Sequence, residues 1–425
     1  MKYLLSLLSI GVSIYSYSQN IDQAINAKEV ARIESTLAAD EMRGRKTGTP
    51  DIDKAADFIA TEFKKAGLEP FNNYSFLQTF YLSRPKLIDQ NGLIDGNELT
   101  TKEIIAITSK PDLSLTEDSG YEVHHINKGE NLYQNVLTLI GQKKNQLVFV
   151  DTSFARMFPR LNGFKQMTFS SPTSVVFILG NYNPKNYSIK VKNDVQEVKL
   201  SNVVGILPGK SKKNEYVIFS GHYDHLGVGR PVNGDSIYNG ANDDAAGTTA
   251  VILLANYFRK LNNNERTIVF AAFTAEEIGG FGSQYFSRQF DPQQVMAMFN
   301  IEMIGTESKW GKNSAYITGF EKTNMGTILQ HNLEGSSFSF YPDPYTQENL
   351  FYRSDNATLA RLGVPAHTIS TSKMDDEPNY HKPSDEISTL DIENMTEIIK
   401  SIAISSRSII SGKDTPDRVK TEELK

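Results

Sequence analysis

Side chains that could bind a metal ion occur in five separate segments of this chain. Two adjacent carboxylates, Asp243 and Asp244, stand in a turn of small residues just before an apolar helical segment. The remaining candidates are His222, Glu276 with Glu277, Glu302, and His381. Zinc accepts carboxylate oxygens and imidazole nitrogens as ligands. Taken singly, each residue is more typical of a turn or a solvated face. The strand pattern around these residues must therefore show whether they form one metal site.

Each candidate ligand follows a short apolar run rich in β-forming residues. Residues 216–219 precede His222, 267–273 precede Glu276 and Glu277, 295–301 precede Glu302, and 364–369 precede the loop of His381. Such runs, alternating with helical segments, predict a mostly parallel sheet covered on both faces. In sheets of this kind, ligands gather outside the carboxyl ends of the strands. The pattern therefore predicts an α/β fold with one shared metal site.

Two helices are predicted to cover this sheet. Residues 246–260 carry apolar side chains at helical spacing, and the start of this helix aims backbone N-H groups towards the carboxylates before it. Residues 391–410 begin with acidic side chains and are followed by Gly412. Acidic residues are typical of the first turn of a helix, and Gly is typical of the position just after its end.

Five motifs resemble, in order and spacing, those of the di-zinc aminopeptidases, metallopeptidase family twenty-eight. They begin with Gly221-His222-Tyr223-Asp224 and continue at residues 240–247, 275–279, 300–305 and 380–385. The resemblance covers residues 199–411, and residues 37–70 are similar to the amino-terminal region of the family. It implies a three-layer αβα zinc-exopeptidase fold with a mostly parallel central sheet.

The resemblance also implies two zinc ions per chain. Asp243 would bridge both ions, His222 and Glu302 would complete one site, and Glu277 and His381 would complete the other. Two metals roughly 3.5 to 4 Å apart can hold one hydroxide between them and polarise the scissile carbonyl, so no serine or cysteine nucleophile is required.

Other residues would act around these ligands. Glu276 would be the general base that takes the proton of the water and passes it to the leaving amine. Asp224 would orient His222, and Asp385 would do the same for His381. Tyr380 would donate a hydrogen bond to the developing oxyanion. The resemblance further implies a cis peptide bond after Asp243.

Two positions depart from the pattern of the family. Glu302 stands where Asp is the commonest residue, which leaves the carboxylate chemistry intact but changes the reach of the side chain. Asn356 stands where the resemblance leads us to expect His.

The zinc peptidase domain is expected to comprise residues 19–81 and 199–412, with a smaller β-rich lobe inserted at 82–198. This lobe faintly resembles a protease-associated domain. Within it, His124 and His125 are predicted to be surface residues and residues 181–198 a return linker. Residues 413–425 are predicted to be a frayed tail.

Composition favours an exported enzyme. The chain has 425 residues, of which 39% are hydrophobic and 22% charged, and it contains no cysteine. Residues 1–18 read as a signal peptide, which predicts a secreted or periplasmic protein without a membrane anchor after cleavage. Without cysteine, disulfides and thiolate metal sites are excluded. A net charge of -6 offers no basic footprint for nucleic acid.

The predicted function is therefore that of a secreted zinc aminopeptidase acting on peptide substrates. Two alternatives remain open. One is a carboxypeptidase or dipeptidase on the same scaffold, which is distinguished by whether an amino-blocked or a carboxyl-blocked substrate is refused. A single-zinc glutaminyl cyclase would bind about one metal and cyclise an amino-terminal Gln.

Overall fold

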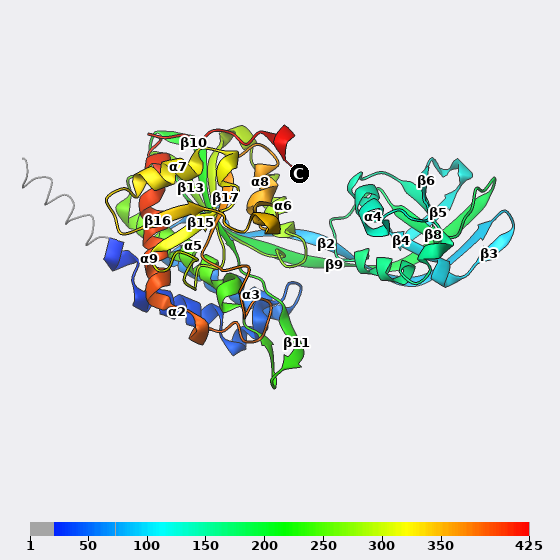
Figure 1. The fold of residues 1–425 in the computed structure, drawn as a ribbon, viewed down its shortest axis with the longest axis horizontal. Helices are drawn as coiled ribbons and strands as arrows, with labels where there is room; N and C mark the ends of the chain where they lie inside the picture. Colours follow the sequence, from blue (N-terminus) through cyan, green and yellow to red (C-terminus); the bar gives the residue numbers. More distant parts are fainter. Residues whose placement is uncertain (1–20, 73, 425) are drawn as a thin grey trace, which may run out of the picture. The chain divides into compact units, whose positions relative to one another are not determined.

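The structure is a computed structural model that describes residues 21–72 and 74–424. The predicted signal peptide lies outside these residues. Contacts divide the chain into two units (Figure 1). Unit 1 comprises the residues up to Thr79 and those from Leu200 onward, and unit 2 comprises Phe80–Lys199. Each unit has its own buried apolar clusters, so each is described by itself.

Unit 1 is built on a mixed sheet whose centre is parallel. Strand β10 (Lys212–His222) lies between β13 (Arg266–Phe273) and β14 (Val295–Ile301), and it is parallel to both. Beyond β14 follow β17 (Ala366–Ser370), which is parallel to it, then β15 (Ser314–Ile317) and β16 (Ser339–Pro342). Beyond β13 follow the antiparallel β9 (Tyr187–Leu207), which also pairs with β1 (Glu69–Pro70), and then β2 (Leu77–Ile94). The predicted α/β fold with a mostly parallel sheet is confirmed.

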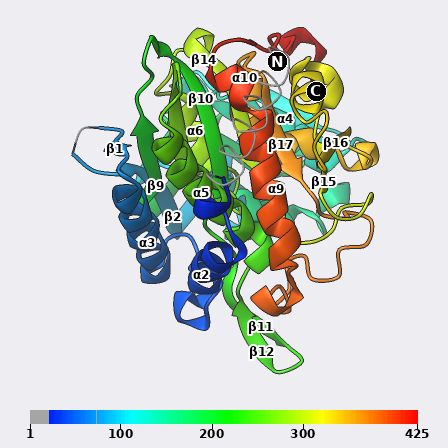
Figure 2. The same cartoon turned by 90° about the vertical axis from the view of Figure 1, so that its left-hand side faces the viewer.

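Side chains that alternate along the strands pack into two different cores. Val217 and Phe219 of β10 belong to one buried cluster, whereas Ile218 between them belongs to another. The first cluster includes residues of α2 (Ala27–Leu37), α3 (Pro50–Ala66), α5 (Ala246–Leu261), α7 (Met325–Asn332), α9 (Ile392–Ser405) and α10 (Arg407–Ile410). The second includes residues of α6 (Phe281–Ser287) and α8 (Asn356–Ala360). Figure 2 shows α2, α5 and α9 together on one side of the sheet. Helices therefore cover both faces, which gives three layers.

Both predicted helices of this unit are present. Helix α5 coincides with the expected segment to within one residue, and α9 with α10 fills the second. Asp391 caps α9, because its carboxylate accepts a hydrogen bond from the backbone N-H of Asn394 at 3.0 Å.

Unit 2 contains a sheet in the order β4 (Ile104–Ile107), β8 (Val175–Leu179), β7 (Gln146–Val150), β6 (Glu122–Ile126), together with α4 (Leu132–Gly141). Strands β3 (Asn97–Leu99) and β5 (Asp112–Thr116) pair with β2 and β9. His124 and His125 are neighbours on β6, so their side chains point to opposite faces and cannot bind one metal. His125 is exposed and His124 half-buried, as expected of surface residues.

The predicted return linker at residues 181–198 is wrong. Strand β9 begins at Tyr187, and its side chains alternate between buried Ile189 and Val191 and exposed Lys190 and Lys192. The lysines that suggested a linker are the solvent face of this strand.

The predicted frayed tail is also wrong. Val419 is buried, and the guanidinium of Arg418 donates to the backbone carbonyl of Val295 at 2.7 Å. The guanidinium of Arg266 in turn donates to the carbonyl of Asp414 at 2.8 Å. Long-range hydrogen bonds between side chain and backbone hold this charged segment, and they leave no apolar periodicity in the sequence.

No helix within residues 21–72 and 74–424 is long and apolar enough to cross a membrane.

Candidate metal centre

The parallel register of the central strands brings three predicted ligand segments to one edge of the sheet. His222 is the last residue of β10 and pairs with Phe273 at the end of β13, three residues before Glu276. Glu302 directly follows Ile301, the last residue of β14. The site therefore lies at the carboxyl ends of the strands, where parallel sheets position ligands.

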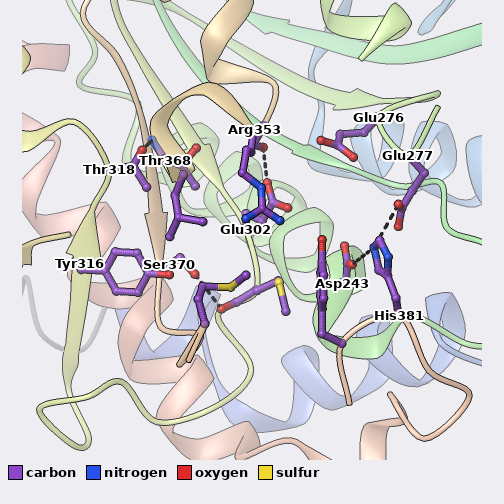
Figure 3. A pocket seen from close by; sticks show the side chains of 15 residues that line it. Asp243, Glu276, Glu277, Glu302, Tyr316, Thr318, Arg353, Thr368, Ser370 and His381 are labelled. Atoms are coloured by element: carbon purple, nitrogen blue, oxygen red, sulfur yellow. Dashed lines mark hydrogen bonds and ion pairs between the residues drawn. The ribbon is translucent and has the colours of Figure 1, made fainter. Parts of the chain in front are cut away.

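Asp243 stands at the centre of the predicted ligands. Its Oδ1 lies 3.1 Å from Nε2 of His222, and its Oδ2 lies 3.2 Å from Nε2 of His381. Glu302 approaches the first imidazole, with Oε1 3.6 Å from Nε2. Glu277 approaches the second, with Oε2 3.2 Å from Nε2 (Figure 3). The structure thus brings all five residues together, with Asp243 shared between two groups.

The donor atoms fit one or two cations. Ligand atoms of His222, Asp243 and Glu302 lie within 4.8 Å of one another, and so do those of His225, Asp243 and Glu277. Nε2 of His222 and Oε1 of Glu277 are buried without a hydrogen-bond partner. Buried polar atoms normally have such partners, so these orphaned atoms are typical of groups that bind an ion. Imidazole and carboxylate ligands of this kind suit zinc.

His225 is a site residue that the sequence analysis did not assign. It lies three residues after His222, and its buried ring approaches the same carboxylate as His381, with Nδ1 2.7 Å from Oε1 of Glu277. The signal was present in the sequence as a second His in the same segment, but spacing alone does not say where a ring at the end of a strand points.

Two carboxylates hold the turn that carries Asp243 in place, that of Asp244 within the turn and that of Asp385 outside it. This turn, η6 (Ala241–Ala245), contains the expected cis peptide bond between Asp243 and Asp244. The buried carboxylate of Asp244 accepts hydrogen bonds from the backbone N-H groups of His222 at 3.1 Å and Met303 at 3.1 Å. It thereby ties the turn to the ends of β10 and β14.

Asp385 does not orient His381 as expected. Its carboxylate accepts from the backbone N-H groups of Asn242 at 2.8 Å and Asp243 at 3.0 Å. The residue therefore fixes the ligand turn. Burial raises the pKa of Asp385 to about 6.

Asp224 contacts His222 mainly through its backbone. Nδ1 of His222 lies 3.0 Å from the Asp224 carbonyl oxygen and 3.8 Å from Oδ1 of its carboxylate. The carboxylate instead accepts from Oγ1 of Thr47 at 2.8 Å and from the backbone N-H of Glu276 at 3.0 Å. Asp224 thus links the histidine at the end of β10 to the glutamate pair after β13.

Arg45 is a second residue whose role the sequence did not reveal. Its fully buried guanidinium donates to the backbone carbonyls of Tyr223 at 2.8 Å, Asn239 at 2.6 Å, Gly240 at 2.8 Å and Leu37 at 2.6 Å. Two of the segments that carry candidate ligands are therefore joined through one side chain. Its place within residues 37–70, which are similar to the amino-terminal region of the family, was the only signal in the sequence.

Glu276 faces the same pocket but stands apart from the two ligand groups. Burial raises the pKa of Glu276 well above its ordinary value, and the negative charges of Glu302, Asp355 and Glu277 add to this rise. The ring of Tyr380 stacks on that of His381, with 4.0 Å between ring centroids. Burial raises the pKa of Tyr380, so the phenol keeps its proton.

The longer side chain of Glu302 is accommodated by a hydrogen bond from Oγ of Ser354 to Oε2. Asn356, two residues further on, donates to the carbonyl of Phe351 at 2.9 Å and accepts from Oγ1 of Thr368 at 2.9 Å. Asn356 is fully buried, so this position holds the local backbone in place.

The cluster of carboxylates attracts positive charge. Burial lowers the pKa of His381, but Asp243 and Glu277 outweigh burial and raise it to about 10. The same opposition holds at His222, where Asp243 and Glu302 raise the pKa well above its ordinary value. A site that favours protonated imidazoles in this way also favours a cation, because both neutralise the same carboxylates.

Three comparisons relate this chain to known proteins. Residues 202–404 match the family model described as peptidase family M28. A probable leucine aminopeptidase of Arthroderma otae is 27% identical over 210 residues, which cover 48% of this chain and 56% of that protein. The chain thus spans about half the length of the curated relatives that it matches.

Two solved structures show the same fold. The aminopeptidase from Aneurinibacillus sp. strain AM-1 aligns with a TM-score of 0.55 and 18% identity, over 96% of this chain and 98% of that one. A zinc aminopeptidase from Bacillus subtilis aligns with a TM-score of 0.53 and 17% identity, over 92% of this chain and 96% of that one.

Proposed function

Since residues 202–404 belong to peptidase family M28, we propose that this protein is a two-zinc aminopeptidase that removes residues from the amino-terminal end of peptides. The observation that carries this proposal is the position of Asp243, whose two carboxylate oxygens each face a different imidazole. The names of the matching proteins, a leucine aminopeptidase and a zinc aminopeptidase, support the metal and the reaction.

Five residues would hold the metals. His222 and Glu302 would bind one zinc ion, Glu277 and His381 the other, and Asp243 both. When bound, the two ions would lower the pKa of water and polarise the carbonyl of the scissile bond. The three carboxylates would be neutralised by this binding, which leaves Glu276 as the remaining carboxylate that lines the pocket.

Glu276 would act as the general base and then as the general acid. Its carboxylate would take one proton from the attacking water, and the same proton would pass to the nitrogen of the leaving amine as the C–N bond breaks. Burial raises the pKa of Glu276 above its ordinary value, which is the direction expected of a carboxylate that must hold a proton between two steps. The carboxylate of Asp224 accepts a hydrogen bond from the backbone N-H of Glu276 and would thereby hold the general base in place. The hydroxyl of Tyr380 would donate to the carbonyl oxygen of the substrate.

We also propose the domain limits and the export that the sequence predicts. Residues 19–81 and 199–412 would form the zinc peptidase domain, together with the packed segment after residue 412, and residues 82–198 would form an accessory lobe. The leader at residues 1–18 would direct the protein out of the cytoplasm, so that it acts on peptides as a secreted or periplasmic enzyme.

Zinc content and hydrolysis should be measured together on the purified full chain. We expect about two zinc ions per chain, hydrolysis of aminoacyl anilides, refusal of amino-blocked controls, and loss of activity on chelation that zinc restores. Refusal of carboxyl-blocked peptides alone would indicate a carboxypeptidase or dipeptidase. About one zinc per chain, with cyclisation of an amino-terminal Gln, would indicate a glutaminyl cyclase.

A further inference from the structure

The pocket beside the proposed metal ligands has one guanidinium among its lining residues, that of Arg353. Figure 3 shows this side chain together with the ligand carboxylates and with Glu276. Arg353 follows the short helical turn η10 (Leu350–Tyr352), and its backbone N-H donates to the carbonyl of Leu350 at 3.1 Å. The backbone that carries the guanidinium is therefore held at the pocket.

The pocket is small and mostly polar away from the metal ligands. Its volume is about 90 Å³, against roughly 10 to 15 Å³ for one water, so it has room for several waters or one side chain. Hydroxyl groups form the wall that lies away from His381 in Figure 3, at Tyr316, Thr318, Thr368 and Ser370. Apolar contact comes from Met303, Leu350 and Met374.

Arg353 is free to exchange its partner. Its Nη1 lies 3.2 Å from Oε2 of Glu348, and both side chains are about half exposed, at 43% and 51%. Such an exposed ion pair contributes little and is screened by salt. Glu348 does not line the pocket, so a carboxylate that enters the pocket could bind the remaining guanidinium donors.

The guanidinium and the proposed ligands belong to the same pocket. Arg353 lines it together with Asp243, Glu277, Glu302 and His381 (Figure 3). A side chain bound in this pocket next to the proposed metals would therefore also face Arg353.

The charges around the pocket favour an acidic side chain over a basic one. Asp243, Glu277 and Glu302 would be neutralised by the metals, and Glu276 would be occupied with the reacting proton. The remaining formal charge on the wall is that of Arg353, which repels a lysine or arginine side chain and can bind a carboxylate through two parallel hydrogen bonds.

We propose that Arg353 selects substrates whose amino-terminal residue is Glu or Asp, by binding the side-chain carboxylate in this pocket. This inference rests on the proposed aminopeptidase function and names its substrate class. Arg353 is thus a specificity-determining residue, and it takes no part in the transfer of the proton.

The test compares kcat/KM of the zinc-loaded full chain on the anilides of Glu, Gln, Leu and Lys. Glu and Gln differ in charge and hardly in shape, so their ratio measures the contribution of the guanidinium. We expect the wild type to prefer Glu over Gln, and Arg353→Gln to lower kcat/KM for Glu by roughly 10- to 100-fold. The same change should alter kcat/KM for Gln by less than about threefold, with zinc content unchanged.

Three control variants sharpen the comparison. Arg353→Lys keeps the charge but loses the planar fork, so it should retain part of the preference for Glu. Glu348→Gln removes the competing carboxylate and should maintain or raise activity on Glu. Arg361→Gln removes an exposed cation that directly follows α8 and does not line the pocket, and it should leave the Glu to Gln ratio unchanged.

The outcomes separate this inference from the proposed function. Hydrolysis of Leu and Gln with no preference for Glu, or an equal loss on every substrate in Arg353→Gln, would overturn the role of Arg353 and leave the aminopeptidase standing. If dipeptides with a free carboxyl terminus are preferred and amidation of this terminus abolishes the preference, the pocket binds the terminal carboxylate and not the side chain. This result would also overturn the proposed role of Arg353. If no anilide is cleaved, the proposed function itself fails.

Discussion

Nδ1 of His225 lies 2.7 Å from Oε1 of Glu277. Both atoms are buried, and their geometry is not that of a hydrogen bond. The other oxygen of this carboxylate, Oε2, lies 3.2 Å from Nε2 of His381. Glu277 is therefore held between two imidazoles. His381 lines the pocket, whereas His225 does not, so a metal bound by His381 is open to substrate.

This arrangement predicts different effects for the two histidines. His381→Ala should lose about one zinc ion per chain, because it removes a ligand. His225→Ala should keep two ions but bind one of them roughly 10- to 100-fold more weakly, because a partner that orients a ligand is lost. Zinc content after dialysis, with a competing chelator for affinity, measures both. The opposite result would make His225 the ligand.

The two glutamates after β13 should separate in the same measurement. Glu276→Gln should keep both zinc ions and substrate binding, yet lose about 10² to 10⁴ in kcat. Glu277→Gln replaces a charged ligand by a neutral amide, so it should lose metal as well as rate, and excess zinc should partly restore it. If Glu276→Gln loses zinc while Glu277→Gln keeps it, the roles are reversed.

Glu302 offers a test of the departure from the usual Asp. Glu302→Asp should keep two zinc ions and substantial activity, because the carboxylate is retained. Glu302→Ala should lose one ion. Metal analysis and kcat/KM on one anilide would be compared for the two variants. Near wild-type values for both would remove Glu302 from the set of ligands.

Arg45 should matter for stability as well as for the site. Arg45→Met removes the guanidinium donor from four buried carbonyls, of which Gly240 keeps a second donor in the backbone N-H of Ala245, so the free energy of unfolding should fall by at least about 3 kcal/mol. Arg43, whose side chain is 55% exposed and 3.5 Å from Asp51, is the matched control, and Arg43→Gln should change stability by less than about 0.5 kcal/mol.

Urea unfolding in excess zinc measures the effect of each arginine substitution. If Arg45→Met does not fold, Arg45→Lys, which retains a charged donor, supplies the measurement. Equal stabilities for the Arg45 and Arg43 variants would contradict the proposed role of Arg45.

The pH dependence of stability should include a contribution from His367. Its Nδ1-H donates to the carbonyl of Thr318 at 2.8 Å, and Nε2 accepts from Oγ1 of Thr323 at 2.8 Å, so the ring is buried in its neutral form. Burial lowers the pKa of His367 from 6.5 to about 4. Below pH 6.5 the unfolded chain binds a proton that the folded protein refuses, so stability falls as the pH drops from about 6.5 to about 4.

The size of this fall is up to about 3 kcal/mol. His367→Gln keeps polar groups in the pocket of the ring but cannot titrate. The difference in unfolding free energy between wild type and variant should therefore shrink as the pH falls through this window. A difference that stays constant from pH 7 to pH 4 would show that His367 is not buried neutral.

The sequence by itself determined the central fold and the kinds of atoms at the site. Strands β10, β13 and β14 contain short apolar runs, and the candidate ligands lie at or just after their carboxyl ends. Because apolar periodicity and residue chemistry are local properties, they can be read without knowledge of distant contacts. The order of the motifs then sufficed to bring His222, Glu277 and Glu302 to one edge, since the carboxyl ends of parallel strands meet there.

Only the tertiary structure decided what each group contacts. The guanidinium of Arg45 binds a carbonyl 178 residues away, and Asp385 binds the turn of Asp243 from 142 residues away. Strand β9 and the packed segment after residue 412 were missed for the same reason. Their hydrogen bonds join distant backbone groups, which every residue possesses, so no residue type or spacing in the sequence marks them in advance.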